Sequence, residues 1–405
     1  MELQVFVIVL IFCGSVISQE NNSNVTNIIN EIFTDQSRTQ QSNRGFGVIV
    51  TPEPFVAPTL QPQTITKANG ERCICVPYYL CDPENNSTFT DGALDGLGRI
   101  DIRFGENECQ DFLDVCCMEG RTTTVPVTPP PTSRSTGCGT RNVNGVDFTI
   151  KVNTRNAAEF AEFPWVLALL DNNNRYFCGA SLIHPQVALT GTHCVIKRQM
   201  NAFKVRAGEW DTQTEKERLP YQESNVRQIV THPEYNPDNL FNDFALVVLD
   251  RPFVLDEHIL TICLPAHNFV STSQNCISNG WGKDVFGQAG KFSVILKKVP
   301  LPMVPNDDCE QQFRATRLGL RFNLHPSFVC AGGQKGVDTC QGDGGSPLSC
   351  PIQGQDSRHY LTGMVAWGIG CNEQRPAAYA NVAGARNWID QQMNALGFGT
   401  SSYQI

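Results

Sequence analysis

Two segments of the chain carry the residue types of a general base, and a third forms a glycine-rich turn. His193 lies in the run Thr-Gly-Thr-His-Cys at 190–194, and Asp243 lies in the run Asn-Asp-Phe-Ala-Leu at 242–246. A buried carboxylate orients an imidazole and stabilises its protonated form, so such a pair takes a proton from a hydroxyl nucleophile. The third segment reads Asp-Thr-Cys-Gln-Gly-Asp-Gly-Gly-Ser-Pro at 338–347, and its Gly344 offers the base no hydroxyl.

The three segments resemble, in the same chain order, the His, Asp and Ser motifs of chymotrypsin-family serine proteases. The resemblance places Gly344 where that family has its nucleophilic serine. Glycine has no atom that can attack an amide, so the acyl-enzyme route is closed. Loss of the nucleophile costs about a millionfold in turnover, or roughly 8 kcal/mol of barrier. We therefore expect a degenerate triad of His193, Asp243 and Gly344 in a catalytically inactive homologue of a trypsin-like protease.

Ser346 is the nearest hydroxyl to the vacant position. Its Cα lies up to ~7 Å along the chain from that of Gly344, whereas attack needs a hydroxyl within ~3 Å of the base. The alternative interpretation is that Ser346 is a small residue in place of a glycine.

Short apolar and β-branched segments after residue 152 predict the strands that would position these residues. They are 165–170, 180–183, 203–208, 245–249, 295–300 and 361–367, and apolar residues at helical spacing predict a helix at 381–396. The resemblance implies an all-β, chymotrypsin-like double six-stranded β-barrel with a C-terminal helix over 152–405.

The cysteines divide the chain into two cross-linked parts. Of the 17 cysteines, Cys13 lies in the leader described below, six lie between Cys73 and Cys117, and ten follow from Cys138 onward. A Thr/Pro/Ser-rich linker at 119–137 separates them. Six cysteines allow fifteen pairings, and spacing alone does not choose among them.

The pattern Cys-Ile-Cys at 73–75, with Cys81, Cys109 and the adjacent Cys116 and Cys117, resembles the clip domain of arthropod serine proteases. The runs Val-Pro-Tyr-Tyr-Leu at 76–80 and Ile-Asp-Ile-Arg at 100–103 resemble those of clip-domain protease homologues, among them the prophenoloxidase-activating factors of insects. The resemblance therefore implies a clip domain at 71–118. It also implies eight disulfides: Cys73–Cys116, Cys75–Cys109, Cys81–Cys117, Cys138–Cys263, Cys178–Cys194, Cys276–Cys350, Cys309–Cys330 and Cys340–Cys371.

The N-terminus indicates a secreted protein. An apolar run at 5–12 precedes Val16 and Ser18, which predicts a signal peptide at 1–18, and a polar arm at 19–70 without apolar periodicity predicts disorder. No later segment reaches the ~18 apolar residues of a membrane span. Glycosylation motifs lie at Asn21, Asn24, Asn85 and Asn86. A net charge of −9 argues against nucleic acid as a partner.

In this family, cleavage after a basic residue frees an ammonium that inserts beside the Asp preceding the nucleophile, here Asp343. The resemblance places this junction after Lys151, at the end of a propeptide-like segment at 138–151. The sequence that follows is Val-Asn-Thr-Arg, where the family has two glycines. Asn and Thr lack glycine's backbone freedom, so we expect no ordered insertion and a zymogen-like loop.

The specificity pocket is expected to survive as a remnant. Asp338 occupies the position that selects Arg and Lys, and Trp367 with Gly368 forms one wall by family resemblance. Ala377 replaces a rim glycine, and its methyl group should narrow the slot. Either the pocket still grips a basic side chain or it is an ancestral relic.

Two further predictions concern processing and metal binding. Family resemblance favours cleavage by an upstream trypsin-like protease, with Arg103 preferred over Lys151. The acidic loop that begins at Glu209 and includes Glu215, Glu217 and Glu223 is either a calcium site or a solvated loop.

The resemblance as a whole implies a noncatalytic cofactor or regulator in prophenoloxidase activation and melanisation, secreted into haemolymph. Prophenoloxidase and an active clip-domain protease are the implied partners, with oligomerisation after processing. Two alternatives are a working trypsin-like endopeptidase and a protein that recognises or adheres to microbial surfaces.

Overall fold

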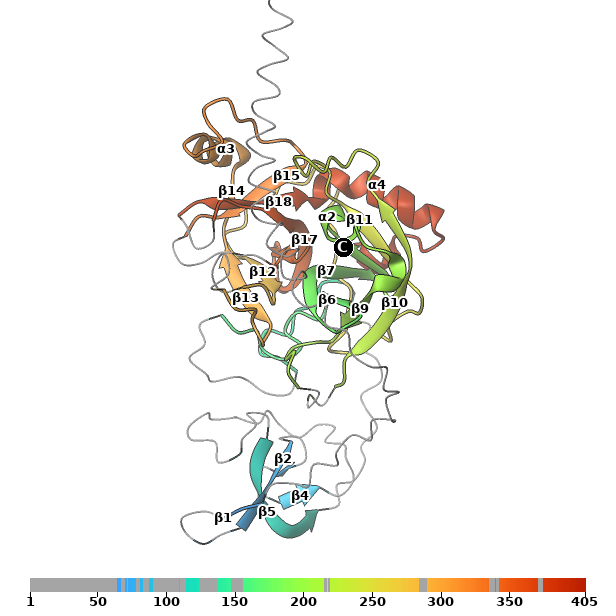
Figure 1. The fold of residues 1–405 in the computed structure, drawn as a ribbon, viewed down its shortest axis with the longest axis vertical. Helices are drawn as coiled ribbons and strands as arrows, with labels where there is room; N and C mark the ends of the chain where they lie inside the picture. The colour runs from blue at the N-terminus through green and yellow to red at the C-terminus, as the bar shows by residue number, and fades with distance from the viewer. Residues whose placement is uncertain are drawn as a thin grey trace, which may run out of the picture.

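The structure is a computed structural model, drawn in Figure 1. It describes residues 64–66, 70, 72–77, 81–82, 87–89, 109, 114–123, 137–146, 156–214, 217, 219–283, 290–334, 339, 342–370 and 374–405. The predicted signal peptide, most of the N-terminal arm, most of the linker and all four glycosylation motifs lie outside these residues.

The first barrel is built from six strands that close on themselves. They are β6 (Val166–Asp171), β7 (Tyr176–His184), β8 (Val187–Thr190), β9 (Phe203–Ala207), β10 (Gln222–Thr231) and β11 (Ala245–Leu249), in the order β10-β11-β8-β7-β6-β9. Every residue of β11 is buried, which explains its unbroken apolar sequence. The short helix α2 (Thr192–Val195) follows β8 directly, and η4 (Met200–Ala202) precedes β9.

The second sheet contains seven strands. They are β12 (Cys276–Gly280), β13 (Lys297–Leu301), β14 (Met303–Val304), β15 (Phe328–Gly332), β16 (Pro347–Ile352), β17 (Gln355–Trp367) and β18 (Pro376–Asn381), in the order β13-β12-β16-β17-β18-β15-β14. The two ends of this order, β13 and β14, are separated in sequence only by Pro302. Proline has no N–H for a ladder, so the run breaks there. β13 and β14 are therefore two parts of one interrupted strand. Counted together, they give the six strands expected for the second barrel.

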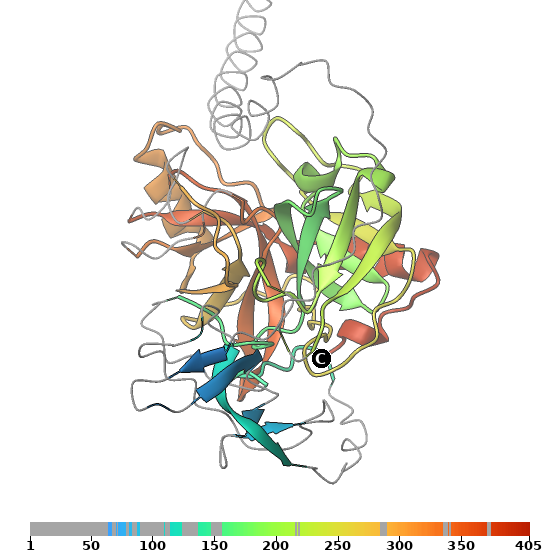
Figure 2. The same ribbon diagram turned by 60° about the horizontal axis from the view of Figure 1, so that its bottom comes forward.

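A common core joins the two sheets, which lie side by side in Figures 1 and 2. Trp165 before β6, Ile277 on β12 and Leu361 on β17 are buried in one cluster with Ile389 of helix α4 (Val382–Ala395). Each such side chain contributes about 1.5–3 kcal/mol when fully buried. The helix begins where the sequence predicted, because Asn381 caps it by accepting a hydrogen bond from the Gly384 N–H at 3.2 Å. Helix α3 (Asn306–Arg314) and η5 (Ser401–Tyr403) complete this part.

The cysteine-rich part forms a small sheet of its own. Its strands are β1 (Thr64–Thr66), β2 (Arg72–Pro77), β3 (Cys81–Asp82), β4 (Ser87–Phe89) and β5 (Asp114–Thr123), in the order β1-β2-β5-β4-β3. The bridges Cys73–Cys116, Cys75–Cys109 and Cys81–Cys117 are those that the family resemblance implied. A sheet with strands this short depends on such cross-links for stability.

Four further disulfides agree with the resemblance: Cys138–Cys263, Cys178–Cys194, Cys276–Cys350 and Cys309–Cys330. Cys340 and Cys371 lie outside the described residues. Within the part of the chain that the structure describes, no helix has both the length and the apolar character needed to cross a bilayer.

Candidate functional site: a degenerate triad

His193 and Asp243 form the hydrogen-bonded pair that the sequence predicted. His193 lies on α2 and Asp243 lies just before β11. The His193 Nδ1 is 2.5 Å from Asp243 Oδ2, and the His193 backbone N–H donates to Asp243 Oδ1 at 2.9 Å. A Cβ at Gly191 would lie 2.7 Å from the imidazole and 2.8 Å from Asp243 Oδ2, so the pair needs glycine there. The side chains are only 5% and 1% exposed, and the orienting half of a triad is therefore intact.

The third triad position is a bare backbone facing the imidazole. A Cβ built on Gly344 would lie 2.6 Å from His193 Nε2, well inside an ordinary contact of about 3.5–4.0 Å. The φ of Gly344 is not positive, so its backbone would accept an L-residue. The imidazole itself thus occupies the space that a serine side chain would need.

Ser346 does not take the place of the missing nucleophile. It is fully buried, and its hydroxyl lies 3.4 Å from the Tyr176 hydroxyl. A Cβ at Gly179 on β7 would come within 2.1 Å of Ser346 Oγ, whereas the Cβ at Gly344 would meet His193. Ser346 therefore packs against β7 as a small core residue, as the second interpretation held.

The imidazole also lies beside the Cys178–Cys194 disulfide. His193 Nε2 is 3.3 Å from Cys194 Sγ, and these three residues form the one His/Cys/Asp/Glu cluster of ligand-forming size among the described residues. Metals are bound by cysteine thiolates. Because both sulfurs are in a disulfide, this cluster is not a metal site.

Trp367, the expected wall of the specificity pocket, is packed against core residues of the second sheet and α3. Trp367 is 3% exposed, and the Phe313 ring of α3 stacks on it at a centroid distance of 4.8 Å. A Cβ built on Gly368 would lie 3.5 Å from that of Ala377, an ordinary contact, so the two positions are neighbours and the expected narrowing of the pocket stays a prediction. Asp338 lies outside the described residues, and its role stays a prediction.

A cation from strand β9, Arg206, binds carboxylates of the acidic loop. The Arg206 guanidinium binds Glu209 Oε2 at 2.5 Å and Glu223 Oε1 at 2.6 Å. Burial raises the pKa of Glu209, and it raises that of Glu217 to about 7, with the charges of Glu209 and Asp211 adding to the effect. A guanidinium thus already lies between two of the candidate ligands. Glu215 lies outside the described residues, and calcium binding stays a prediction.

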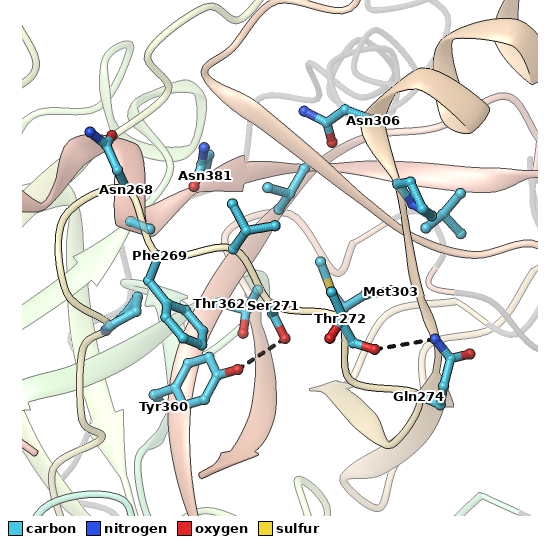
Figure 3. A pocket seen from close by; sticks show the side chains of 16 residues that line it. Asn268, Phe269, Ser271, Thr272, Gln274, Met303, Asn306, Tyr360, Thr362 and Asn381 are labelled. Carbon is cyan, nitrogen blue, oxygen red and sulfur yellow. Dashed lines mark hydrogen bonds between the residues drawn. The ribbon is translucent and has the colours of Figure 1, made fainter. Parts of the chain in front are cut away.

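A separate cavity of about 470 Å³ contains none of the triad residues. Figure 3 shows its lining, in which the Tyr360 hydroxyl donates to Ser271 Oγ at 2.9 Å and the Gln274 amide donates to the Thr272 carbonyl at 3.3 Å. The half-exposed Phe269 ring also faces it. Its lining residues carry no charge, so it suits neutral, largely apolar groups.

Sequence reasoning missed Lys297, Tyr176 and Phe313. Lys297 lies inside a predicted strand beside a second lysine, a pattern typical of a solvated face. Nothing in its local sequence indicates that it approaches Asp343. The processing candidates Arg103 and Lys151 lie outside the described residues.

Two barrel-like sheets that bring a His–Asp pair to a glycine-rich turn define a chymotrypsin-like protease fold with a degenerate triad. In agreement, residues 152–389 match the family model described as Trypsin, and residues 62–118 match the one described as Serine protease Clip domain PPAF-2.

The chain belongs to the clip-domain serine protease homologues. It is 46% identical over 295 residues to phenoloxidase-activating factor 2 of Galleria mellonella, covering 69% of this chain and 97% of that protein. It is 37% identical over 332 residues to inactive CLIP domain-containing serine protease A8 of Anopheles gambiae, covering 80% and 89% respectively. A third relative, inactive CLIP domain-containing serine protease A28 of the same mosquito, is 33% identical over 347 residues, covering 79% and 88%.

Proposed function

We propose that this chain is a secreted, noncatalytic cofactor in prophenoloxidase activation, the protease cascade of arthropod immunity that leads to melanisation. The observation that carries the proposal is the contact between His193 and the empty position at Gly344, where an added Cβ would lie 2.6 Å from the ring. The nucleophile is lost, whereas the His193–Asp243 pair and the fold that positions it are kept. Relatives named as inactive proteases and as phenoloxidase-activating factors support this assignment.

The partners are prophenoloxidase and an active clip-domain protease, which the chain holds together in haemolymph. Processing acts on the clip domain, with Arg103 as the preferred site. Three disulfides span that site in sequence, so the two halves stay joined after the cut and the clip sheet keeps its cross-links. The cut therefore opens the chain within the clip domain without releasing either half, and assembly into oligomers follows.

Reconstitution tests the proposal. Purified prophenoloxidase and its activating protease are mixed with the processed chain, and oxidation of a catechol substrate is followed. We expect a several-fold rise in output, which an Arg103→Gln variant that resists processing does not give. Unchanged output overturns the proposal, and reduced output makes the chain a restraint on the cascade instead of a cofactor.

The two alternatives have separate tests. A serine-directed fluorophosphonate that labels any residue of the cleft would establish a working endopeptidase, whereas we expect no labelling. Binding of the isolated chain to bacterial or fungal wall preparations, together with no effect in the reconstitution, would establish microbial recognition.

A further inference from the structure

The Asp343 carboxylate occupies a defined site beneath the end of β12. It is 2% exposed, and its Oδ1 accepts a hydrogen bond from the Gly282 N–H at 2.8 Å. A Cβ at Gly280 or Gly282 would lie 2.2 or 2.4 Å from this carboxylate group, so both glycines make room for it. The backbone at Gly280 and Gly282 thus forms a site for one buried carboxylate, hereafter called the receptor.

Lys297 brings a positive charge to the same place. It begins β13, where it pairs with Gly280 across the ladder. Its Nζ donates to the Gly282 carbonyl at 2.7 Å and to the Lys283 carbonyl at 3.3 Å, and it lies 3.7 Å from Asp343 Oδ2. These carbonyl contacts fix the ammonium group, and its side chain is only 18% exposed.

A carboxylate this deeply buried is costly unless a cation accompanies it. The other described neighbours of the receptor are largely aromatic: Phe292 approaches the turn at Gly342, and Tyr176 packs edge-on against both Trp281 and Phe292. Burial raises the pKa of Tyr176, and the negative charge of Asp343 raises it further, so the phenol stays neutral. Lys297 therefore supplies a positive charge that helps to balance Asp343.

The segment that follows the expected cleavage junction is anchored at the same strand. Ala157 forms a β-bridge with Lys297, and the Lys298 N–H donates to the Asn156 carbonyl at 2.7 Å. An ammonium released after Lys151 would sit four residues from Asn156, a span of at most ~14 Å. Cleavage would thus create a second cation on a segment that is anchored at the strand carrying Lys297.

We propose that Lys297 performs internally the task that cleavage performs in working relatives, so that the Asp343 loop at 342–346 is ordered in the uncleaved chain. This proposal differs from the zymogen-like loop expected from the sequence, because an internal cation takes the place of the released ammonium. Processing then has no part in ordering this loop and acts through the clip domain. The inference concerns the fold of the protease-like domain and holds whatever the cascade partner is.

Hydrogen–deuterium exchange on the full-length chain tests it. In a Lys151→Ala variant, which removes the cleavage site, amides 342–346 should be as protected as in chain cleaved after Lys151. Lys297→Met should speed their exchange at least tenfold, and Lys297→Arg, which keeps the charge, should restore most of the protection.

Lys298→Met is the matched control. This neighbour binds a different buried carboxylate, Glu162 Oε2 at 2.7 Å, so its loss should leave amides 342–346 unchanged. If Lys297→Met folds poorly, the double change Lys297→Met with Asp343→Asn should recover its yield, because the uncompensated charge is gone. A merely structural role for the lysine stem would not be rescued in this way.

Two results would overturn the proposal. One is unchanged protection of amides 342–346 in Lys297→Met. The other is protection that appears only after cleavage at Lys151, which would show that the released ammonium is required.

Discussion

Restoring the missing hydroxyl should not restore an enzyme. The change Gly344→Ser returns the residue that working relatives carry, and the backbone accepts it because the φ of Gly344 is not positive. The new Cβ, however, would begin 2.6 Å from His193 Nε2. The variant therefore tests whether the imidazole has settled into the space of the lost side chain.

The magnitude follows from that distance. To reach an ordinary contact of about 3.5 Å the imidazole must retreat by roughly 1 Å, against the 2.5 Å contact that holds its other nitrogen to Asp243. Overpacking of a closed site costs about 1–3 kcal/mol, or roughly 2–12 °C in melting temperature for a domain of this size. A misplacement of about 1 Å costs roughly 100-fold in rate, so labelling by a fluorophosphonate should run at about 1% of the rate of a working relative.

Calorimetry and probe labelling measure the two effects separately. Gly344→Ala is the matched control, because it introduces the same Cβ without a hydroxyl. It should lose the same stability as Gly344→Ser and show no labelling. If both variants melt like the unchanged chain and the serine variant labels at the rate of a working protease, the close contact between ring and backbone is not a property of this protein.

Three other outcomes are expected. Burial lowers the pKa of His359 to about 4 from 6.5. Between pH 4 and 6.5 the unfolded chain therefore binds a proton that the folded chain does not bind. The free energy of unfolding falls as the pH drops through this range. In urea unfolding, His359→Leu should remove about 2 kcal/mol of the loss between pH 7 and 4.5, and an equal loss in the variant would contradict this origin. The pH dependence of stability due to Glu217 has the opposite sign. Its pKa is raised to about 7 from 4.5, so stability is lost as the pH rises through that range. Glu217→Gln should be about 2–3 kcal/mol more stable at pH 8, with no advantage at pH 4. Finally, chain cut after Lys151 should run as one species on a non-reducing gel and as two after reduction, because Cys138–Cys263 crosses the cut; separation without reductant would show that the bridge is absent.

Those parts of the fold that are fixed by local pattern could be predicted from the sequence. The strand at 245–249 and the helix after Asn381 appear where apolar runs and spacing placed them, since both patterns follow directly from burial. The split at Pro302 was not predicted, because strand pairing on both sides had to be known before the missing N–H mattered.

The residues of the candidate site likewise fall into those that local motifs predict and those that they do not. His193 and Asp243 are recognisable because their neighbours form motifs, and the structure brings them together as expected. The lysine at 297 and Asp343 are far apart in the sequence and share no motif. Only the β12–β13 register, which pairs Lys297 with Gly280, brings them to one site. Long-range pairs of this kind depend on tertiary register, which a single sequence does not display.

The aromatic stack between Phe313 and Trp367 has a pharmacological consequence. With this ring in place Trp367 is only 3% exposed, so a small molecule finds little of its surface to bind. The cavity beside Phe269 and Tyr360, whose lining residues carry no charge, is instead a surface that suits neutral, apolar groups.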